Sequence, residues 1–449
     1  MNPIYASGLI GMRMIVLSAV FMLGSTGTWG YDNIVKCRLE IDRNILPADE
    51  NQRAVIKITL DALPPSKHSR QPVNLAIVLD RSGSMRGDKL EKAKEAAIQA
   101  FRRLDSRDMF SLVVYDTQVE TIVPAQSAEN AQWIESRIRQ ITAGNSTALF
   151  GGISQGAAEV RKNLDRQCIH RIILLSDGLA NVGPNSPEDL GRLGTALIKE
   201  GIAVTTVGVG TDYNEDLMTR LSQASDGNTY FVETSGDLPR IFNTELGDVL
   251  SVVARKVYLT IECPAGVRPV SVIGREGRIR GQTVELYMNQ LYGGQEKYAL
   301  VEVEVPAGRH GETVAIASAR ISYENPFTRE KETSGAEVSG RFSKDRSEVD
   351  NSDNVTVKKA YYLTVNSVGG DKAIALADEG KKDSAADMLR SSATRLKQAG
   401  AKYDDQELTK KGEAMAESAR RIEKEGMTSK TRKTIRTESY QQINQQIAQ

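Results

Sequence analysis

The chain has 449 residues, 40% of them hydrophobic and 26% charged, and its 58 Lys and Arg residues balance 58 Asp and Glu residues to a formal net charge of zero. Since a domain averages about 150 residues, this length favours roughly three folded domains, and the composition excludes an intrinsically disordered chain. The balanced charge gives no global electrostatic basis for binding nucleic acid or an anionic membrane. The three cysteines contain no Cys-x-x-Cys pair and there are only three histidines, so a disulfide scaffold and a thiolate or histidine metal site are not indicated.

Residues 1–30 have the layout of a secretory signal peptide. Arg13 precedes an apolar run at 14–23, and small residues follow it, which predicts cleavage near 27–31 and export to a periplasmic or extracellular location. Ser25 stands where a lipoprotein signal would have its cysteine, so no lipid anchor is expected. The run is too short to span a bilayer and no later segment reaches about 20 apolar residues, so stable membrane insertion is not expected. The alternative interpretation is a buried N-terminal helix.

The region 31–70 contains two segments, 35–41 and 54–60, in which apolar and polar residues alternate. The same period-two pattern returns in 254–345, at 257–261, 284–288, 298–305 and 314–322. Strands of this kind need a second sheet to bury their apolar faces. The two regions are therefore predicted to form one β-sandwich, with the intervening residues 71–253 inserted into it.

The inserted region 71–253 alternates short apolar runs with amphipathic segments. Nearly continuous apolar strands are predicted near 75–79, 110–115, 172–175 and 203–207, as in a parallel sheet covered on both faces. Between the first two, apolar residues recur every three or four positions from Leu90 to Leu104, which predicts a helix. Residues 117–123 alternate apolar and polar residues directly after Tyr115 and Asp116, which predicts an antiparallel edge hairpin within the same sheet. The fold class is therefore α/β, a doubly wound, mostly parallel sheet.

The region 346–440 is rich in Ala, Lys and Glu and predicts two or three helices. Apolar residues keep helical spacing from Ala385 to Leu396, and Gly400 is a candidate helix stop. The Gln-rich segment 441–449 is expected to be a frayed tail. Near it, a basic group is most simply a solvated helix face, with contact to an acidic surface as the alternative; its members are Lys430, Arg432, Lys433 and Arg436.

Oxygen-bearing side chains follow the predicted parallel strands. Asp80, Ser82 and Ser84 alternate along a Gly-containing turn after the first strand, Thr147 precedes a helix, and Asp177 follows the strand near 172–175. Ligands of an open α/β sheet gather outside the carboxyl ends of its strands, so these oxygens are expected to converge. Mg²⁺ suits them because it prefers oxygen ligands and keeps several waters. Each residue also has a structural alternative: Asp80 and Thr147 as helix caps, and Asp177 with Gly178 as an ordinary turn.

Four segments, 74–85, 87–90, 146–149 and 174–178, together resemble the von Willebrand factor type A domain with a complete metal-ion-dependent adhesion site. The resemblance covers roughly residues 72–253. It implies that Asp80, Ser82, Ser84, Thr147 and Asp177 are the metal positions, with the two serines bonding the ion directly and the aspartates directly or through water. It further implies that a partner protein supplies a carboxylate to the remaining coordination position.

The wider layout is similar to exported proteins of the inter-alpha-trypsin inhibitor heavy chain and calcium-activated chloride channel-like type. The region before residue 72 is, however, too short for the large domain that precedes the A domain in the inhibitor heavy chains.

A hydrolase is the third interpretation of the chain. His170 and nearby serines could suggest a catalytic triad, but no G-x-S-x-G elbow is present and His170 is predicted at the sheet edge opposite the metal turn. We therefore expect a non-enzymatic adhesion module that binds an Asp or Glu of a partner protein through Mg²⁺, with Mn²⁺ or Ca²⁺ as substitutes. The alternative is a structural assembly or scaffold subunit whose sandwich and helices make the main contacts. Partner identity and oligomeric state stay open.

Cys37 and Cys263 lie in the two flanks assigned to one sandwich. Because export would place them where disulfides persist, they are candidates for a bond that joins the flanks across the inserted domain. Three separate buried thiols are the alternative.

Overall fold

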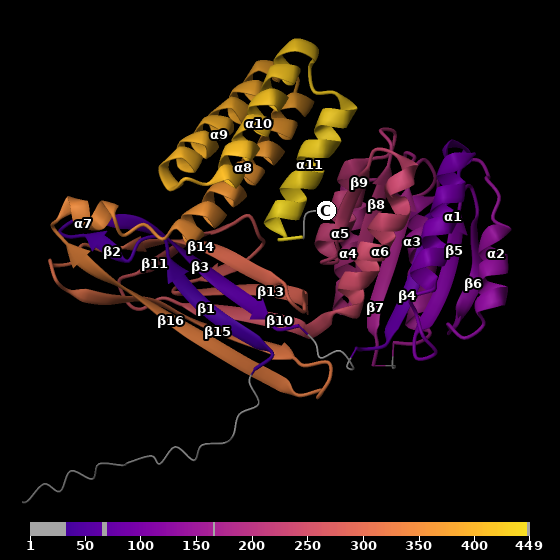
Figure 1. The fold of residues 1–449 in the computed structure, drawn as a ribbon, viewed down its shortest axis with the longest axis horizontal. Helices are drawn as coiled ribbons and strands as arrows, with labels where there is room; N and C mark the ends of the chain where they lie inside the picture. Colours follow the sequence, from indigo (N-terminus) through magenta and orange to yellow (C-terminus); the bar gives the residue numbers. More distant parts are fainter. Residues whose placement is uncertain (1–32, 65–69, 165–166, 447–449) are drawn as a thin grey trace, which may run out of the picture. The chain divides into compact units, whose positions relative to one another are not determined.

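The computed structural model describes residues 33–64, 70–164 and 167–446. The predicted signal segment at 1–30 and the cleavage region at 27–31 lie outside these ranges. The described residues form a mostly parallel sheet with its helices, two further sheets and a set of C-terminal helices (Figure 1). None of the helices in the described ranges combines the length and the apolar character of a membrane span.

The mostly parallel sheet has six strands in the order β6-β5-β4-β7-β8-β9. Only β6 runs antiparallel, at the edge beside β5, as predicted from the alternating segment there. Every residue of β4, β5, β7 and β8 is buried, which explains their continuous apolar sequences. The strands are β4 (Val73–Asp80), β5 (Met109–Tyr115), β6 (Val119–Ser127), β7 (Ile169–Ser176), β8 (Ile202–Val209) and β9 (Thr229–Val232).

Helices cover both faces of this sheet, which confirms the doubly wound prediction. One hydrophobic core joins the sheet to α1 (Asp88–Phe101), α2 (Ala131–Arg139) and α6 (Leu238–Leu250). The opposite core joins it to α3 (Leu149–Arg161), α4 (Pro187–Lys199) and α5 (Glu215–Ala224). Each strand therefore ends between two helical layers, and the loops at the carboxyl ends of the strands are left to form a site.

The flanking strands form a β-sandwich, as predicted, because two sheets share one core. Residues on both sides of the α/β region contribute to each sheet; β14, for example, pairs with β3 along its whole length. One sheet contains β1 (Val35–Ile41), β3 (Gln52–Ala62), β14 (Glu296–Val305) and β11 (Arg268–Ile273). The other contains β12 (Arg278–Arg280), β13 (Thr283–Tyr292), β10 (Val252–Glu262), β15 (Thr313–Glu324), β16 (Lys331–Ser343) and β2 (Ile45–Pro47).

The disulfide considered between Cys37 and Cys263 is not present, and both residues are buried free thiols. Burial raises the pKa of each thiol to about 11. Strand pairing and the shared core, rather than this covalent bond, join the two flanks of the sandwich.

The C-terminal region contains a short helix and four long ones, more than the two or three predicted. They are α7 (Arg346–Asp350), α8 (Val355–Asp378), α9 (Lys382–Tyr403), α10 (Gln406–Glu425) and α11 (Ser429–Ile443). Gly400 does not stop α9, which continues to Tyr403. A Cβ at Gly400 would lie 2.3 Å from the Thr409 Oγ1 atom of α10, so this glycine allows two helices to approach closely.

The Gln-rich segment is held in place through Gln446 instead of fraying from Gln441 as expected. The Gln441 side chain donates to the carbonyl of Thr229 at 3.0 Å, and the Gln446 side chain accepts from the Thr229 N–H at 3.1 Å. Gln445 accepts from the Tyr298 N–H at 3.2 Å. These bonds connect residues 441–446 to β9 and β14, and residues 447–449 lie outside the described ranges.

Candidate functional site

Three loops meet at the carboxyl edge of the parallel sheet. Backbone hydrogen bonds join the turn after β4 to the loop between α2 and α3, from Gly83 N–H to the Asn145 carbonyl at 2.8 Å and from Gly144 N–H to the Arg81 carbonyl at 2.6 Å. The Thr147 N–H donates to the Asn181 side chain at 2.8 Å, which adds the loop after β7. The positions of the five predicted residues are thus set by a bonded framework.

The two carboxylates, Asp80 and Asp177, have no solvent-exposed surface. Asp80 Oδ1 accepts from the Ser82 N–H, and Asp80 Oδ2 accepts from the Ser176 hydroxyl, both at 2.8 Å. Asp177 Oδ1 accepts from the Ser84 hydroxyl at 2.6 Å, and its Oδ2 lies 2.6 Å from the Lys89 ammonium. Both carboxylates are thereby oriented within one hydrogen-bonded group.

The three hydroxyls converge on one point beside Gly178. The Ser82 and Ser84 oxygens lie 3.0 Å apart. A Cβ placed on Gly178 would be 3.2 Å from Thr147 Oγ1, 3.3 Å from Ser84 Oγ and 3.8 Å from Ser82 Oγ. Glycine therefore leaves the space between these oxygens free of a side chain, and the structure brings together all five residues that the sequence singled out.

The alternative roles considered for these residues, helix caps and an ordinary turn, do not match their contacts in the structure. The residue that caps α1 is Gly87 and the one that caps α3 is Ala148, and neither helix has a side-chain cap. Asp80 and Thr147 are therefore not helix caps. Asp177 is more than a turn residue because its buried carboxylate contacts Ser84 and Lys89.

Burial raises the pKa of the Asp80 carboxyl to about 6, although hydrogen bonds from Ser82 and Ser176 oppose this shift. Two buried carboxylates with one ammonium beside them favour an additional cation. Hydroxyl and carboxylate oxygens are ligands suited to Mg²⁺, Mn²⁺ or Ca²⁺. In the described ranges no group of three or more His, Cys, Asp or Glu side chains is placed to hold a metal. The five residues at this edge are not such a group, because three of them contribute hydroxyls and only two contribute carboxylates.

Two residues at this edge were not singled out from the sequence. Ser176 precedes Asp177 and holds Asp80, while Lys89 lies in the first turn of α1 and pairs with Asp177. The sequence could have pointed to Lys89, because this residue lies in segment 87–90, one of the four segments that resemble the type A domain. Its direction toward Asp177 depends on how α1 packs, which a motif alone does not define.

His170 lies at the opposite end of β7 from Asp177 and takes no part in this site. Its ring contacts the Asn74 amide at 3.2 Å. Burial, aided by the charge of Arg255, lowers the pKa of His170 to about 4. The arrangement is that of a packed core histidine and not of a catalytic base.

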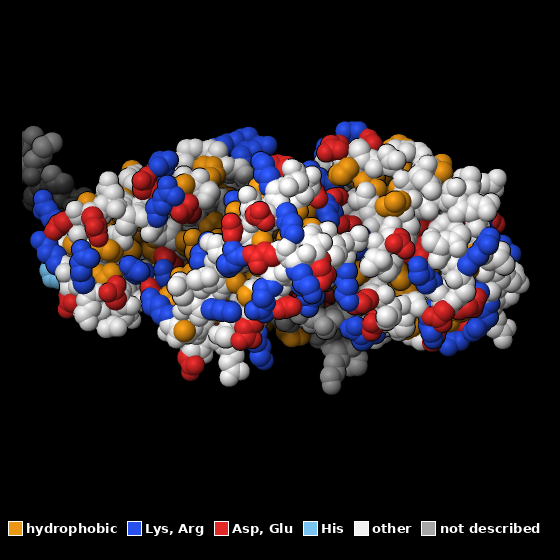
Figure 2. All heavy atoms as spheres, turned by 90° about the horizontal axis from the view of Figure 1, so that it is seen from above, with side chains coloured by type: hydrophobic (Ala, Val, Ile, Leu, Met, Phe, Trp, Pro, Cys, Tyr) orange, Lys and Arg blue, Asp and Glu red, His pale blue; other side chains and the backbone are white. Residues whose placement is uncertain are grey.

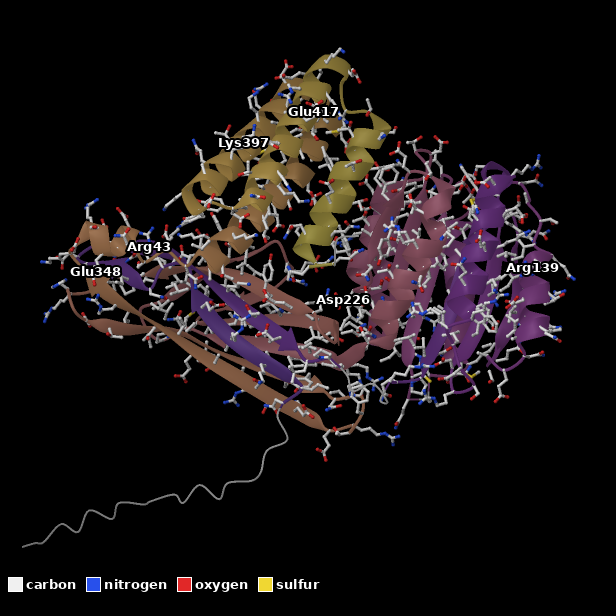
Figure 3. The ribbon with its side chains drawn as sticks, viewed as in Figure 1. Arg43, Arg139, Asp226, Glu348, Lys397 and Glu417 are labelled. Carbon is white, nitrogen blue, oxygen red and sulfur yellow. The ribbon has the colours of Figure 1, made fainter. Side chains whose placement is uncertain are left out.

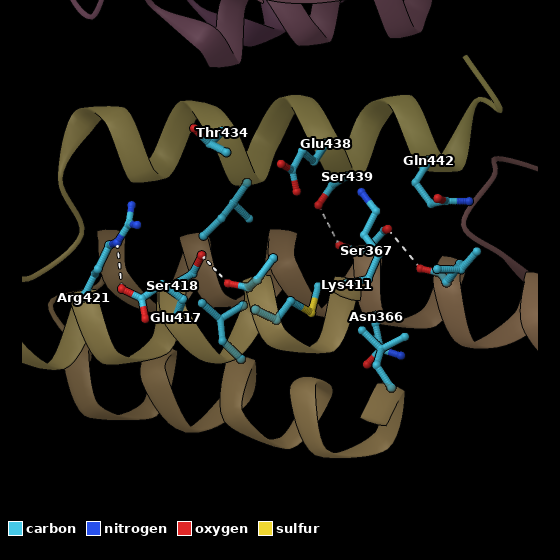
Figure 4. Close-up of a pocket in the computed structure, with 16 residues that line it drawn as sticks. Asn366, Ser367, Lys411, Glu417, Ser418, Arg421, Thr434, Glu438, Ser439 and Gln442 are labelled. Atoms are coloured by element: carbon cyan, nitrogen blue, oxygen red, sulfur yellow. Dashed lines mark hydrogen bonds and ion pairs between the residues drawn. The ribbon is translucent and has the colours of Figure 1, made fainter. Parts of the chain in front are cut away.

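A cavity of about 230 Å³ lies apart from these loops, between the C-terminal helices α8, α9, α10 and α11 (Figure 4). Leucine, methionine and isoleucine side chains line it together with charged ones such as Lys411 and Glu438. It contains none of the five predicted residues.

Comparison with known proteins finds a family match in the α/β region that contains the five predicted residues. The family profile described as the von Willebrand factor type A domain matches residues 74–244. An uncharacterized protein of Synechocystis sp., sll0103, is 27% identical over 64% of this chain and 72% of its own length. Human inter-alpha-trypsin inhibitor heavy chain H4 is 27% identical over 36% of this chain, but the match spans only 18% of the heavy chain.

Two solved structures share the fold over most of the chain. A von Willebrand factor type A protein from Catenulispora acidiphila has a TM-score of 0.66 at 17% identity, covering 84% of this chain and 91% of that one. The ArnB paralog VWA2 from Sulfolobus acidocaldarius has a TM-score of 0.60 at 16% identity, covering 91% and 98%. The matching segment and the doubly wound sheet together show that residues 74–244 of this chain form a von Willebrand factor type A domain.

Proposed function

We propose that this protein is an exported adhesion module that binds an acidic side chain of a partner protein through a divalent ion at the edge of its type A domain. The domain itself suggests a role in protein–protein interaction. One observation carries the proposal: three hydroxyls surround the space beside Gly178, and two fully buried carboxylates adjoin them.

In this proposal Asp80, Ser82, Ser84, Thr147 and Asp177 hold Mg²⁺, and Mn²⁺ or Ca²⁺ can replace it. When bound, the ion supplies a Lewis-acidic position that accepts a carboxylate oxygen. The chain's own residues orient the donors: Ser176 fixes Asp80, and the Ser84 hydroxyl fixes Asp177. Because three of the donors are neutral hydroxyls, the ion would retain more positive charge than it would among five carboxylates.

The surface agrees with a protein partner rather than a polyanion. The formal net charge is zero, and Figure 2 shows Lys and Arg side chains mixed with Asp and Glu over the face in view. A nucleic-acid surface would need a predominance of positive charge. Export is proposed from the Arg13 and apolar-run layout, and terminal mass analysis tests it: intact Met1 in cytoplasmic material would contradict export.

Isothermal titration calorimetry of the full chain tests the metal site. We expect one Mn²⁺ or Mg²⁺ per chain in the wild type and none in Asp80→Ala. Thr147→Val keeps the shape of the side chain but removes its hydroxyl. Since even outer-shell partners of a metal are worth about 10–100-fold in affinity, its affinity should fall at least about tenfold.

Ser146→Ala is the matched control because it removes a hydroxyl one residue away from Thr147 and keeps the Ser146 backbone N–H, which donates to the Thr117 hydroxyl at 3.2 Å. It should bind the ion as the wild type does. Unchanged binding in Asp80→Ala, with folding preserved by circular dichroism, would overturn the assignment of the site.

A further inference from the structure

We propose that Lys89 is an internal counter-cation of the metal site, which lowers its affinity for the divalent ion and raises the affinity of the loaded site for an anionic partner group. This inference rests on the proposed function and adds a residue that selects the class of ligand. Lys89 is the second residue of α1, and its Nζ atom lies 2.6 Å from Asp177 Oδ2.

The pair joins a buried carboxylate to a partly exposed ammonium. Asp177 is fully buried, whereas the Lys89 side chain is 32% exposed. A Cβ on Gly210 would lie 3.7 Å from Lys89 Nζ, so the ammonium lies next to the loop that follows β8. Gly210 has a φ of 71°, a conformation that favours glycine.

The charges of the site follow from these contacts. Two carboxylates and one ammonium leave a single net negative charge around the hydroxyls. A bound divalent ion then gives a single net positive charge, whereas without Lys89 the loaded site would be neutral. The neighbouring Arg81 does not supply this charge, since it pairs with Asp116 at 3.2 Å and Glu120 at 3.0 Å.

Lys89 therefore acts in opposite directions on the two binding steps. Its charge repels the entering divalent ion and competes with it for Asp177, but it attracts a carboxylate that approaches the loaded site. A neutral hydroxyl or amide of a partner gains nothing from this charge. The partner group selected is thus anionic, and the selection comes from Lys89 as well as from the ion.

Two titrations of the full chain test these opposite effects of Lys89 on metal affinity and on anion affinity. Lys89→Met should raise Mn²⁺ affinity, measured by calorimetry, by about tenfold, because a unit charge a few Å from a divalent ion is removed. In the Mn²⁺-loaded protein it should lower the affinity for acetate by a similar factor, measured from the water-proton relaxation rate. Lys89→Gln removes the charge but retains a hydrogen-bond donor, and it should change both constants in the same directions. It replaces Lys89→Met in both titrations if that variant does not fold.

Lys89→Arg retains the charge and should leave both constants close to the wild type. Lys92→Met is the positional control, since Lys92 lies on the same helix and pairs with the exposed Glu95 at 3.0 Å. The inference is overturned if the neutral variants bind Mn²⁺ equally or more weakly, or if acetate affinity does not fall. A wild type that binds no Mn²⁺ would instead contradict the proposed function, so the two failures are distinguishable.

Discussion

Gly178 and Lys89 lie against the five side chains at the carboxyl edge of the sheet: Gly178 adjoins the three hydroxyls, and Lys89 Nζ lies 2.6 Å from Asp177 Oδ2. Asp80, Ser82, Ser84, Thr147 and Asp177 could be brought together in advance, because parallel strands present their carboxyl ends at the same edge. The space that Gly178 leaves between the hydroxyls, and the reach of Lys89 to Asp177, depend on side-chain packing. The sequence therefore predicted which five side chains meet at this edge, and the structure added the contacts of Gly178 and Lys89 with them.

Asp248 of α6 provides a prediction at the same scale. Burial, reinforced by the nearby Glu245, raises its pKa from 3.8 to about 7. Between those values the folded chain retains a proton that the unfolded chain has released, so this residue lowers the free energy of unfolding as pH rises from about 4 to about 7. Asp248→Asn removes the effect and should stabilise the protein at pH 8 by at least about 1 kcal/mol, with little change at pH 4.

Chemical denaturation of wild type and Asp248→Asn at the two pH values measures this difference. Asp350→Asn, at an exposed position of α7, is the control and should leave the pH profile unaltered. An equal stability change at pH 4 and pH 8 would show that the charge of Asp248 is not responsible.

At the scale of elements, α11 and β16 differ from expectation for physical reasons. The basic residues of α11 do contact acidic groups, and these belong to the same chain: Arg432 lies 2.7 Å from Asp216 and Lys433 lies 2.6 Å from Glu215. β16 was not predicted because its buried positions are few and its sequence is largely polar. It forms nonetheless because it pairs with β15 along most of its length, which strand periodicity alone does not reveal.

Lys433 and Lys430 make a matched pair for testing how α11 is held. The Lys433 and Glu215 side chains are 4% and 7% exposed, whereas Lys430 and its partner Glu233 are 53% and 58% exposed. Lys433→Met removes one of the two cations that contact the buried Glu215 carboxylate, while Arg432 remains, and it should lower the free energy of unfolding by about 2 kcal/mol. Lys430→Met should cost at most about 1 kcal/mol.

Amide hydrogen exchange should report the same contrast within α11, with faster exchange in Lys433→Met than in Lys430→Met. Equal exchange and equal stability in the two variants would mean that the buried pair does not anchor this helix.

At the scale of the whole molecule, the sheet class, the insertion and the shared sandwich were predictable because they follow from hydrophobic periodicity. The polar contacts between the α/β region and the sandwich were not, since they join segments distant in sequence. The fully buried Arg171 of β7 lies 3.2 Å from Glu245 and donates to Gln290 and Tyr292 of β13 at 2.8 and 2.7 Å. Asp226, labelled in Figure 3, accepts from the Asn289 N–H at 2.5 Å. These contacts bind the type A domain to the sandwich.

The central claim is that the site edge binds a protein partner through a divalent ion, and crosslinking capture from periplasm or culture medium tests it most directly. The arms are wild type in Mg²⁺, wild type with chelator, Thr147→Val and the Ser146→Ala control. The account predicts one partner that is captured by the wild type and by Ser146→Ala in Mg²⁺, and lost with chelator or with Thr147→Val. Capture of the same partner in all four arms would contradict it and would place the contact on the sandwich or the helices, as in a scaffold subunit.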